Sequence, residues 1–221
     1  MKVLVTGATG TVGTKVVKAL LQRGADVRAF TRERPKPSTF PGAVEIALGD
    51  LRDPVSVAEA IKGVDELFLL IGNVSDEFTQ ALTAYGLAKK AGLKDVTYLS
   101  VFKADQFLEV PHFAAKYAVE EAIRAGGIPY TILRPGYFFQ NERRLKPVLT
   151  GASVYPVPAG NQGIAVVDVR DIAEAAAISL TEEGHKERLR SGFVRVAEWS
   201  ACSSQMVEAA GQRNHLPDTR F

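Results

Sequence analysis

Three glycines at three-residue spacing near the start of the chain are typical of a phosphate-binding turn. Gly7, Gly10 and Gly13 follow an apolar run at residues 2–6 and precede a helical pattern at residues 12–21. In such a turn the first glycine permits a sharp bend, the second lets backbone approach a pyrophosphate, and the third lets helix and strand pack closely. The N–H groups of the helix's first turn would then point at the anion.

The spacing therefore predicts a dinucleotide site. Its first members are Gly7, Thr9, Gly10, Thr11, Val12 and Gly13, with hydroxyl donors from the two threonines. A flavodoxin-like turn that uses glycine only for its geometry is the alternative.

The end of the next expected strand, residues 25–31, bears on which dinucleotide binds. An acidic residue there would bind the ribose 2′-hydroxyl of NAD. This chain instead has Arg32, followed by Glu33 and Arg34. A guanidinium can bind a 2′-phosphate through two hydrogen bonds, which favours NADP. Glu33 leaves NAD open, and nearby prolines also fit a solvated surface turn.

Strand and helix patterns alternate along the rest of the chain. We expect strands at 43–48, 66–71, 94–100 and 128–133, and helices at 54–62, 76–90 and 111–125. Asp53 should cap the first of these helices, with Pro54 at its first position. In the helix at 76–90, the side chains expected to face inward are Phe78, Leu82, Tyr85 and Leu87. With the glycine turn, this order predicts an α/β fold with a doubly wound parallel Rossmann sheet of six or seven strands.

The motifs resemble those of the short-chain dehydrogenase/reductase superfamily. The glycine turn reads TGATGTVG, and His112 and Lys116 form an H-x-x-x-K pattern followed by VEEAIRAGGIPYTILRPGYFFQN. With VDVRDIA at 167–173, these motifs are similar to the NmrA-like branch of atypical members over roughly residues 1–180. The resemblance implies a Rossmann fold, a nicotinamide cofactor and, in catalytic members, reduction of small carbonyls, quinones or imines. Some relatives only sense the nicotinamide redox state.

The same resemblance suggests which residues react. In the main branch a strand-end serine precedes Tyr-x-x-x-Lys, in which lysine holds the nicotinamide ribose and tyrosine acts as the general acid. The matching residues here are Ser100, His112 and Lys116. His112 replaces the tyrosine, and it either donates the proton itself or is a polar residue at a helix start. Tyr117 cannot substitute, because it points about 100° away from Lys116 around the helix.

Further cofactor contacts are expected at strand ends. Asp50 and Leu51 resemble the superfamily segment that contacts adenine, with a plain turn as the alternative. Residues 71–73 end a strand beside the first one, where ligands lie in open α/β sheets. The aromatic run 137–139 could stack on a planar ligand or be ordinary packing. The remaining cofactor-binding candidates are Asp50, Leu51, Ile71, Gly72, Asn73, Lys116, Pro135 and Tyr137.

Composition limits the partners. The chain has 221 residues, and 27 Lys and Arg against 25 Asp and Glu give no reason to expect nucleic acid or membrane binding. The single Cys202 excludes an internal disulfide, and no metal-ligand cluster is apparent. No apolar run approaches the roughly 20 residues that span a bilayer. Because the chain starts with a core strand, we expect no signal peptide and a cytoplasmic protein.

We expect one NAD(P)-binding domain over residues 1–221, in which 136–163 and 181–221 form a small substrate-side lobe. The lobe should contain a strand at 193–197 and a helix at 203–210. A homodimer or a regulatory protein partner is left open.

Together these features predict an NADP(H)-dependent reductase of a small planar carbonyl or quinone. The alternative is a non-catalytic NADP(H)-binding redox sensor that acts through a partner protein. Ser100 with Lys116 favours the enzyme, whereas the missing tyrosine favours the sensor.

Overall fold

A parallel sheet of seven strands organises the molecule. The computed structural model describes residues 1–42, 44–152, 164–186, 188–191 and 195–197. The strand order is β3-β2-β1-β4-β5-β6-β9, and every neighbouring pair runs parallel. The strands are β1 (Lys2–Val5), β2 (Asp26–Thr31), β3 (Glu45–Leu48), β4 (Glu66–Leu69), β5 (Asp95–Leu99), β6 (Tyr130–Arg134) and β9 (Arg188–Ser191).

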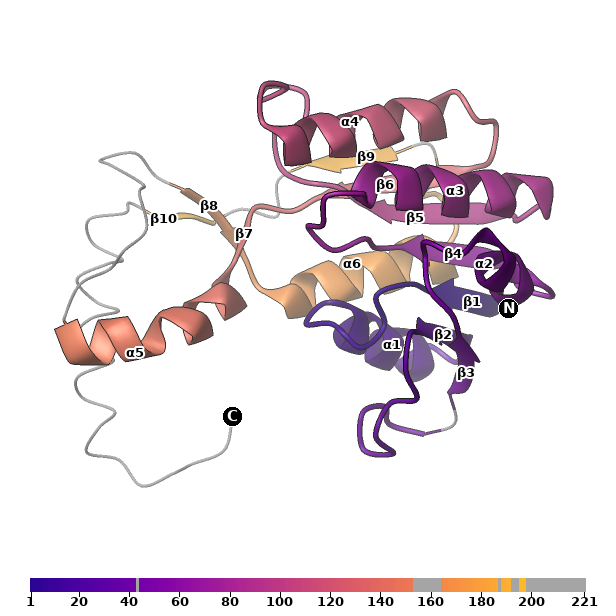
Figure 1. Cartoon of the computed structure of the whole chain (residues 1–221), viewed down its shortest axis with the longest axis horizontal. Helices are drawn as coiled ribbons and strands as arrows, with labels where there is room; N and C mark the ends of the chain where they lie inside the picture. The colour runs from indigo at the N-terminus through magenta and orange to yellow at the C-terminus, as the bar shows by residue number, and fades with distance from the viewer. Residues whose placement is uncertain (43, 153–163, 187, 192–194, 198–221) are drawn as a thin grey trace.

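Helices cover both faces of this sheet (Figure 1). On one face lie α1 (Gly13–Gln22) and α6 (Val169–Thr181), which share a buried apolar cluster with β1 and β2. On the other lie α2 (Pro54–Ile61), α3 (Glu77–Lys90) and α4 (Pro111–Arg124), with a second cluster. The doubly wound Rossmann fold predicted from the sequence is therefore confirmed.

Two local predictions have opposite outcomes. The Asp53 carboxylate accepts hydrogen bonds from the backbone N–H groups of Val55 and Ser56, so the predicted cap of α2 is confirmed. The prediction that Phe78 faces inward is wrong, because its side chain is 41% exposed. The prediction for Tyr85 is confirmed, and Leu82 and Leu87 are partly buried against the same apolar cluster. The buried residues of α3 are Glu77, Ala81, Ala84, Tyr85 and Ala88, which follow one another at helical spacing.

A second, smaller sheet follows the sixth strand. It consists of β7 (Tyr137–Phe138), β8 (Ile164–Val167) and β10 (Arg195–Ala197), in the order β10-β8-β7. After β7, the 3₁₀ helix η1 (Phe139–Asn141) leads into α5 (Glu142–Ala152), which stands apart from the large sheet (Figure 1). Gly136 allows β7 to approach β8, since a Cβ there would lie 2.3 Å from the Ala165 carbonyl oxygen.

The expected lobe maps onto this region only in part. The strand predicted at 193–197 is found at Arg195–Ala197, antiparallel to β8. Residues 188–191, which were also assigned to the lobe, instead form β9 and extend the large sheet beside β6. Residues 153–163 of the expected lobe and the helix predicted at 203–210 lie outside the described residues. The division into a domain and a lobe stays a prediction.

Within the described ranges, no helix is both long and apolar enough to cross a membrane. In the same ranges, no three His, Cys, Asp or Glu side chains come together in a group that could hold a metal ion.

Candidate functional site

The glycine turn between β1 and α1 has the geometry that its spacing predicts. Gly7 has a φ of +60°, a conformation that favours glycine, and its carbonyl accepts a hydrogen bond from Gly10 N–H at 3.0 Å. A Cβ on Gly13 would lie 2.1 Å from the Gly7 carbonyl oxygen. The turn therefore packs so tightly against the start of α1 that no larger residue fits at position 13.

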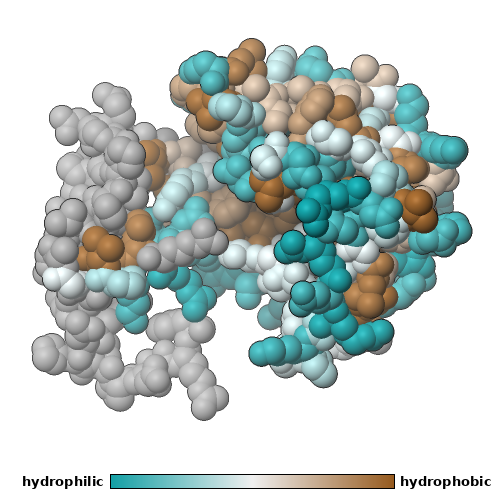
Figure 2. Space-filling model, in the orientation of Figure 1, coloured by the Kyte–Doolittle hydropathy of each residue, from teal (hydrophilic) through white to brown (hydrophobic). Residues whose placement is uncertain are grey.

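This turn borders a cavity of about 540 Å³. The space-filling view is hollowed between the large sheet and α5, with hydrophobic residues at the floor (Figure 2). The predicted cofactor residues that line the cavity are Gly7, Thr9, Gly10, Thr11, Val12, Arg32, Asp50, Leu51 and Gly72. Those outside its wall are Gly13, Ile71, Asn73, Lys116, Pro135 and Tyr137. Nine of the nineteen residues that line the cavity are thus among the predicted ones, because strand ends and the turn meet at one edge of the sheet.

Charged residues line the part of the cavity near β2 and β3. Arg52 binds the Asp50 carboxylate with two guanidinium nitrogens, at 2.7 and 3.0 Å. These hydrogen bonds, with smaller contributions that include the charge of Arg32, lower the pKa of Asp50 to about 2. Arg32 itself has no ion-pair partner among the described residues. It is therefore a cation in the cavity wall that is available to a ligand anion.

Lys116 lies just behind the other part of the cavity wall. Its side chain is buried, and Nζ donates to the carbonyl oxygens of Ile71 and Leu99, both at 3.3 Å. The two neighbours of Ile71 in the chain, Leu70 and Gly72, line the cavity. Burial lowers the pKa of Lys116, and the negative charge of Glu77 offsets part of this effect.

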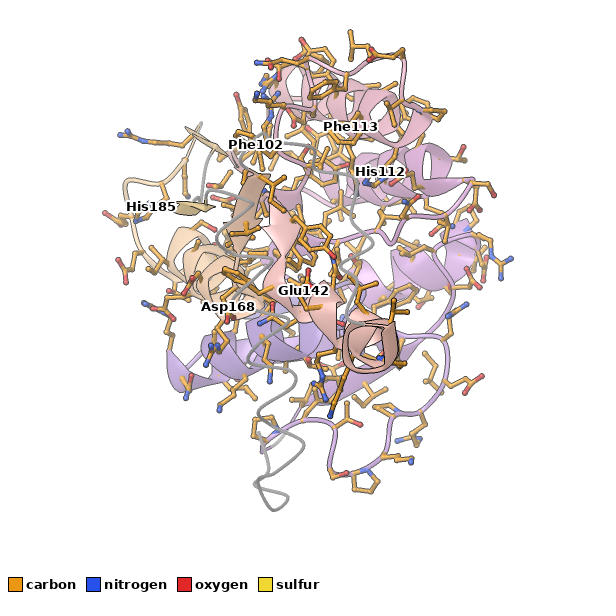
Figure 3. The ribbon with its side chains drawn as sticks, turned by 90° about the vertical axis from the view of Figure 1, so that its left-hand side faces the viewer. Phe102, His112, Phe113, Glu142, Asp168 and His185 are labelled. Atoms are coloured by element: carbon orange, nitrogen blue, oxygen red, sulfur yellow. The ribbon has the colours of Figure 1, made fainter. Side chains whose placement is uncertain are left out.

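His112 lies one turn before Lys116 on α4, on the side that faces α3. Its Nδ1 is 2.6 Å from Glu77 Oε1, and the other carboxylate oxygen of Glu77 is 3.6 Å from Lys116 Nζ. The His112 side chain is 25% exposed and lies at the start of α4, so both interpretations of this residue stay open. Figure 3 views the molecule from the side of α5 and labels His112 and Phe113 on α4 and Glu142 at the start of α5.

Ser100 follows β5 but takes part in a different network. Its hydroxyl donates to Glu120 Oε1 at 2.5 Å, inside the protein. Glu120 is fully buried and also accepts hydrogen bonds from both Arg134 and Arg124. Among the described residues, no hydrogen bond joins this hydroxyl directly to His112 or Lys116. The structure thus brings two of the three predicted catalytic side chains together and places the third in a buried ion network.

Several residues of the site were not singled out from the sequence. Glu77, which contacts both His112 and Lys116, is the most important of them. The cavity wall also includes Phe30, Thr31, Gly49, Arg52, Leu70, Val74, Asp76, Gln80, Phe138 and Asn141. Phe138 belongs to the predicted aromatic run, and Arg52 directly follows the Asp50-Leu51 pair. An acidic residue in the first turn of a helix is common because it interacts favourably with the helix dipole. The sequence therefore provided no reason to assign Glu77 a functional role.

Comparison with known proteins identifies related chains. The NmrA-like family matches residues 1–209. A NAD(P)H azoreductase from Xenophilus azovorans is 28% identical over 189 residues, which are 84% of this chain and 65% of the relative. A (4-alkanoyl-5-oxo-2,5-dihydrofuran-3-yl)methyl phosphate reductase from Streptomyces griseus is 33% identical over 189 residues, with the same two coverages. The chain thus spans just under two thirds of the length of these curated relatives.

Among solved structures, the triphenylmethane reductase of Citrobacter sp. complexed with NADP(H) superposes with a TM-score of 0.78 at 30% identity. The match covers 90% of this chain and 72% of the reductase chain.

Proposed function

Because the chain belongs to the NmrA-like family, we propose that it is a reductase that uses NADP(H) to reduce a planar, conjugated small molecule. The observation that carries the proposal is the glycine turn that opens onto a cavity. The wall of this cavity includes Arg32, which has no ion-pair partner among the described residues, and behind the wall Glu77 joins the buried Lys116 to the partly exposed His112. The names of the azoreductase, the phosphate reductase and the triphenylmethane reductase support the same class of reaction.

The residues present fit a dinucleotide phosphate. Gly10 leaves backbone accessible where a pyrophosphate would lie, and the tight contact of Gly13 with Gly7 aims the first turn of α1 at that position. Arg32 would bind the 2′-phosphate, and Arg52, held by Asp50, would add positive charge beside it. Lys116 would bind the ribose next to the reactive ring from behind the ends of β4 and β5.

Two-electron reduction of a quinone or a carbonyl requires one hydride and one proton. When bound, the nicotinamide supplies the hydride. His112 would supply the proton from Nε2 to the oxygen or nitrogen of the acceptor that gains electron density. Because its side chain is 25% exposed, the ring can take a new proton from solvent after each turnover. The acceptor is reduced by two electrons, and the cofactor is oxidised by two.

The acceptor is proposed to be planar and conjugated, such as a quinone or a carbonyl in conjugation. Phe138 supplies an aromatic ring in the cavity wall next to Asn141, on the side of the second sheet. A flat aromatic ligand stacked on such a ring gains about 0.5–1.5 kcal/mol beyond the area it buries. We expect a better fit for flat acceptors than for aliphatic aldehydes.

The test is the oxidation of NADPH by the purified chain with a panel of acceptors, followed by loss of NADPH absorbance. The panel contains a quinone, an azo dye, a triphenylmethane dye and an aliphatic aldehyde. We expect turnover with at least one planar acceptor and little turnover with the aldehyde. Saturable NADPH binding without turnover on any acceptor would refute the reductase and favour the redox sensor.

A further inference from the structure

Glu77 is a buried carboxylate that joins two basic side chains of another helix. It lies in the first turn of α3, is 6% exposed, and has Oε1 at 2.6 Å from His112 Nδ1. Its Oε2 is buried and has no hydrogen-bond donor among the described residues, but lies within ion-pair distance of Lys116 Nζ at 3.6 Å. The carboxylate therefore spans the two residues of the H-x-x-x-K pattern.

A histidine in this position needs such an acid. A lysine cation beside a tyrosine favours loss of the phenol proton, because it stabilises the phenolate. Beside a histidine, the same cation repels the imidazolium, which is the form that donates a proton. Lys116 is 4% exposed, so water screens this repulsion poorly. A carboxylate between the two groups compensates one of the positive charges and allows both to coexist.

The hydrogen bond also orients the imidazole ring. A carboxylate accepts and cannot donate, so the proton of the neutral ring lies on Nδ1. The other ring nitrogen, Nε2, forms no hydrogen bond with any residue that the structure describes. It is the atom of His112 left to contact a ligand, as in other sites where a carboxylate fixes the tautomer of a histidine.

The other groups near His112, Glu77 and Lys116 that the structure describes do not supply this negative charge. The ring of Tyr98 on β5 lies 5.3 Å from Lys116 Nζ, and burial raises the pKa of its phenol, so it is neutral. Glu120, one turn further along α4, is occupied by Ser100, Arg124 and Arg134. In the part of the chain that the structure describes, Glu77 is the only acid within ion-pair distance of His112 or Lys116.

We propose that Glu77 is a positioning residue that holds His112 with Nε2 toward the acceptor and keeps Lys116 charged beside it. This role deepens the proposed reductase function and rests on it, because it assigns how the histidine performs the work of the absent tyrosine. The residue acts through its two partners and does not itself contact the reacting atoms.

The first measurement uses the unaltered protein and needs no turnover. Nitrogen-15 NMR distinguishes which ring nitrogen of a neutral histidine carries the proton, and His112→Gln identifies the His112 signal among the three histidines. The expected result is protonation at Nδ1 in alkaline solution, whereas a free imidazole prefers Nε2. A His112 ring protonated at Nε2 would overturn the proposal.

The second measurement compares Glu77→Gln with the unaltered chain and with Glu121→Gln, which removes an exposed acid on α4. NADPH affinity and quinone turnover are measured across pH, and circular dichroism checks the fold. Because Glu77→Gln removes the charge that raises the pKa of Lys116, NADPH affinity should begin to fall at a lower pH. Turnover at neutral pH should fall by about 10²-fold, as for a misplaced general acid. Glu121→Gln should match the unaltered chain in both.

Glu77→Asp separates charge from orientation. It should restore the pH dependence of NADPH binding while turnover stays reduced, since the shorter side chain keeps the charge but cannot reach both partners. A folded Glu77→Gln variant with unchanged pH profiles for binding would overturn the proposal. If the unaltered protein turns over no acceptor but shows the Nδ1 proton and the binding shift, the reductase function fails and the positioning role of Glu77 stands.

Discussion

Replacing Glu66 by glutamine should stabilise the protein above neutral pH and change little in acid. Glu66 and Asp95 are register partners at the first positions of β4 and β5, at the end of the sheet opposite the cavity. Both are buried, and both Asp95 carboxylate oxygens and one from Glu66 have no hydrogen-bond partner among the described residues. Burial, with repulsion from Asp95, raises the pKa of Glu66 from 4.5 to about 7, and burial raises that of Asp95 to about 6.

Proton linkage determines whether the free energy of unfolding rises or falls with pH. Between pH 4.5 and about 7 the folded state retains a proton on Glu66 that the unfolded chain has released, so the free energy of unfolding falls as pH rises through this window. One pKa unit corresponds to about 1.4 kcal/mol, so the ionised Glu66 costs the folded protein about 3 kcal/mol above pH 7. Glutamine has nearly the same shape and cannot ionise, so the variant avoids this cost.

The assay is guanidinium unfolding followed by circular dichroism at several pH values from acid to about pH 8. The difference between Glu66→Gln and the unaltered protein should be near zero at low pH and grow to about 3 kcal/mol in favour of the variant at high pH. Asp65→Asn is the matched control with opposite sign, because hydrogen bonds from Lys94 and the Lys2 backbone lower the pKa of Asp65. A Glu66→Gln effect that is independent of pH, or a loss of stability at high pH, would refute the reasoning.

Four further outcomes are expected around the cavity. Lys116→Ala should weaken NADPH binding about tenfold or more and reduce turnover, because it removes a charge-assisted hydrogen bond of about 1.5–3 kcal/mol; an unchanged dissociation constant would contradict the ribose contact. His112→Phe should leave NADPH affinity nearly intact and reduce turnover by about 10²–10⁴-fold. The loss of turnover should be smaller with a quinone, because its hydroquinone anion is less basic than an alkoxide. Turnover of His112→Phe equal to that of the unaltered protein would exclude the histidine as proton donor. Arg32→Ala should lower affinity for NADPH about tenfold with little effect on NADH, as measured by parallel titrations; equal losses for both would refute the 2′-phosphate contact. Gly13→Ala should lower stability by about 1–3 kcal/mol and weaken cofactor binding, because its Cβ would lie 2.1 Å from the Gly7 oxygen; a melting temperature like that of the unaltered chain would contradict the packing described.

The fold was predictable wherever local pattern and chemistry determine structure. The glycine turn specifies its strand–helix context through spacing alone, and Asp53 followed by Pro54 determines the start of α2. Strand ends could then be placed at one edge of the sheet, which located Arg32 and Asp50 in the cavity wall. These features depend on a few neighbouring residues and on the rule that ligands bind at the carboxyl ends of parallel strands.

The remaining features depend on contacts between distant segments. Glu77 acquires its role only because α3 packs beside α4, and the same packing leaves Phe78 exposed although the residue is apolar. Ser100 is bound by Glu120, twenty residues further along the chain, for the same kind of reason. The edge strand β9 has the sequence RLRS, which lacks the apolar run of a buried strand.

The most direct test of the proposed dinucleotide site is a calorimetric titration of the purified chain with NADPH, and in parallel with NADH. We expect saturable binding of one NADPH per chain, with NADH weaker because Arg32 then has no 2′-phosphate to bind. Absence of heat and of saturation for both nucleotides would contradict the central claim that the glycine turn and its cavity form a dinucleotide site.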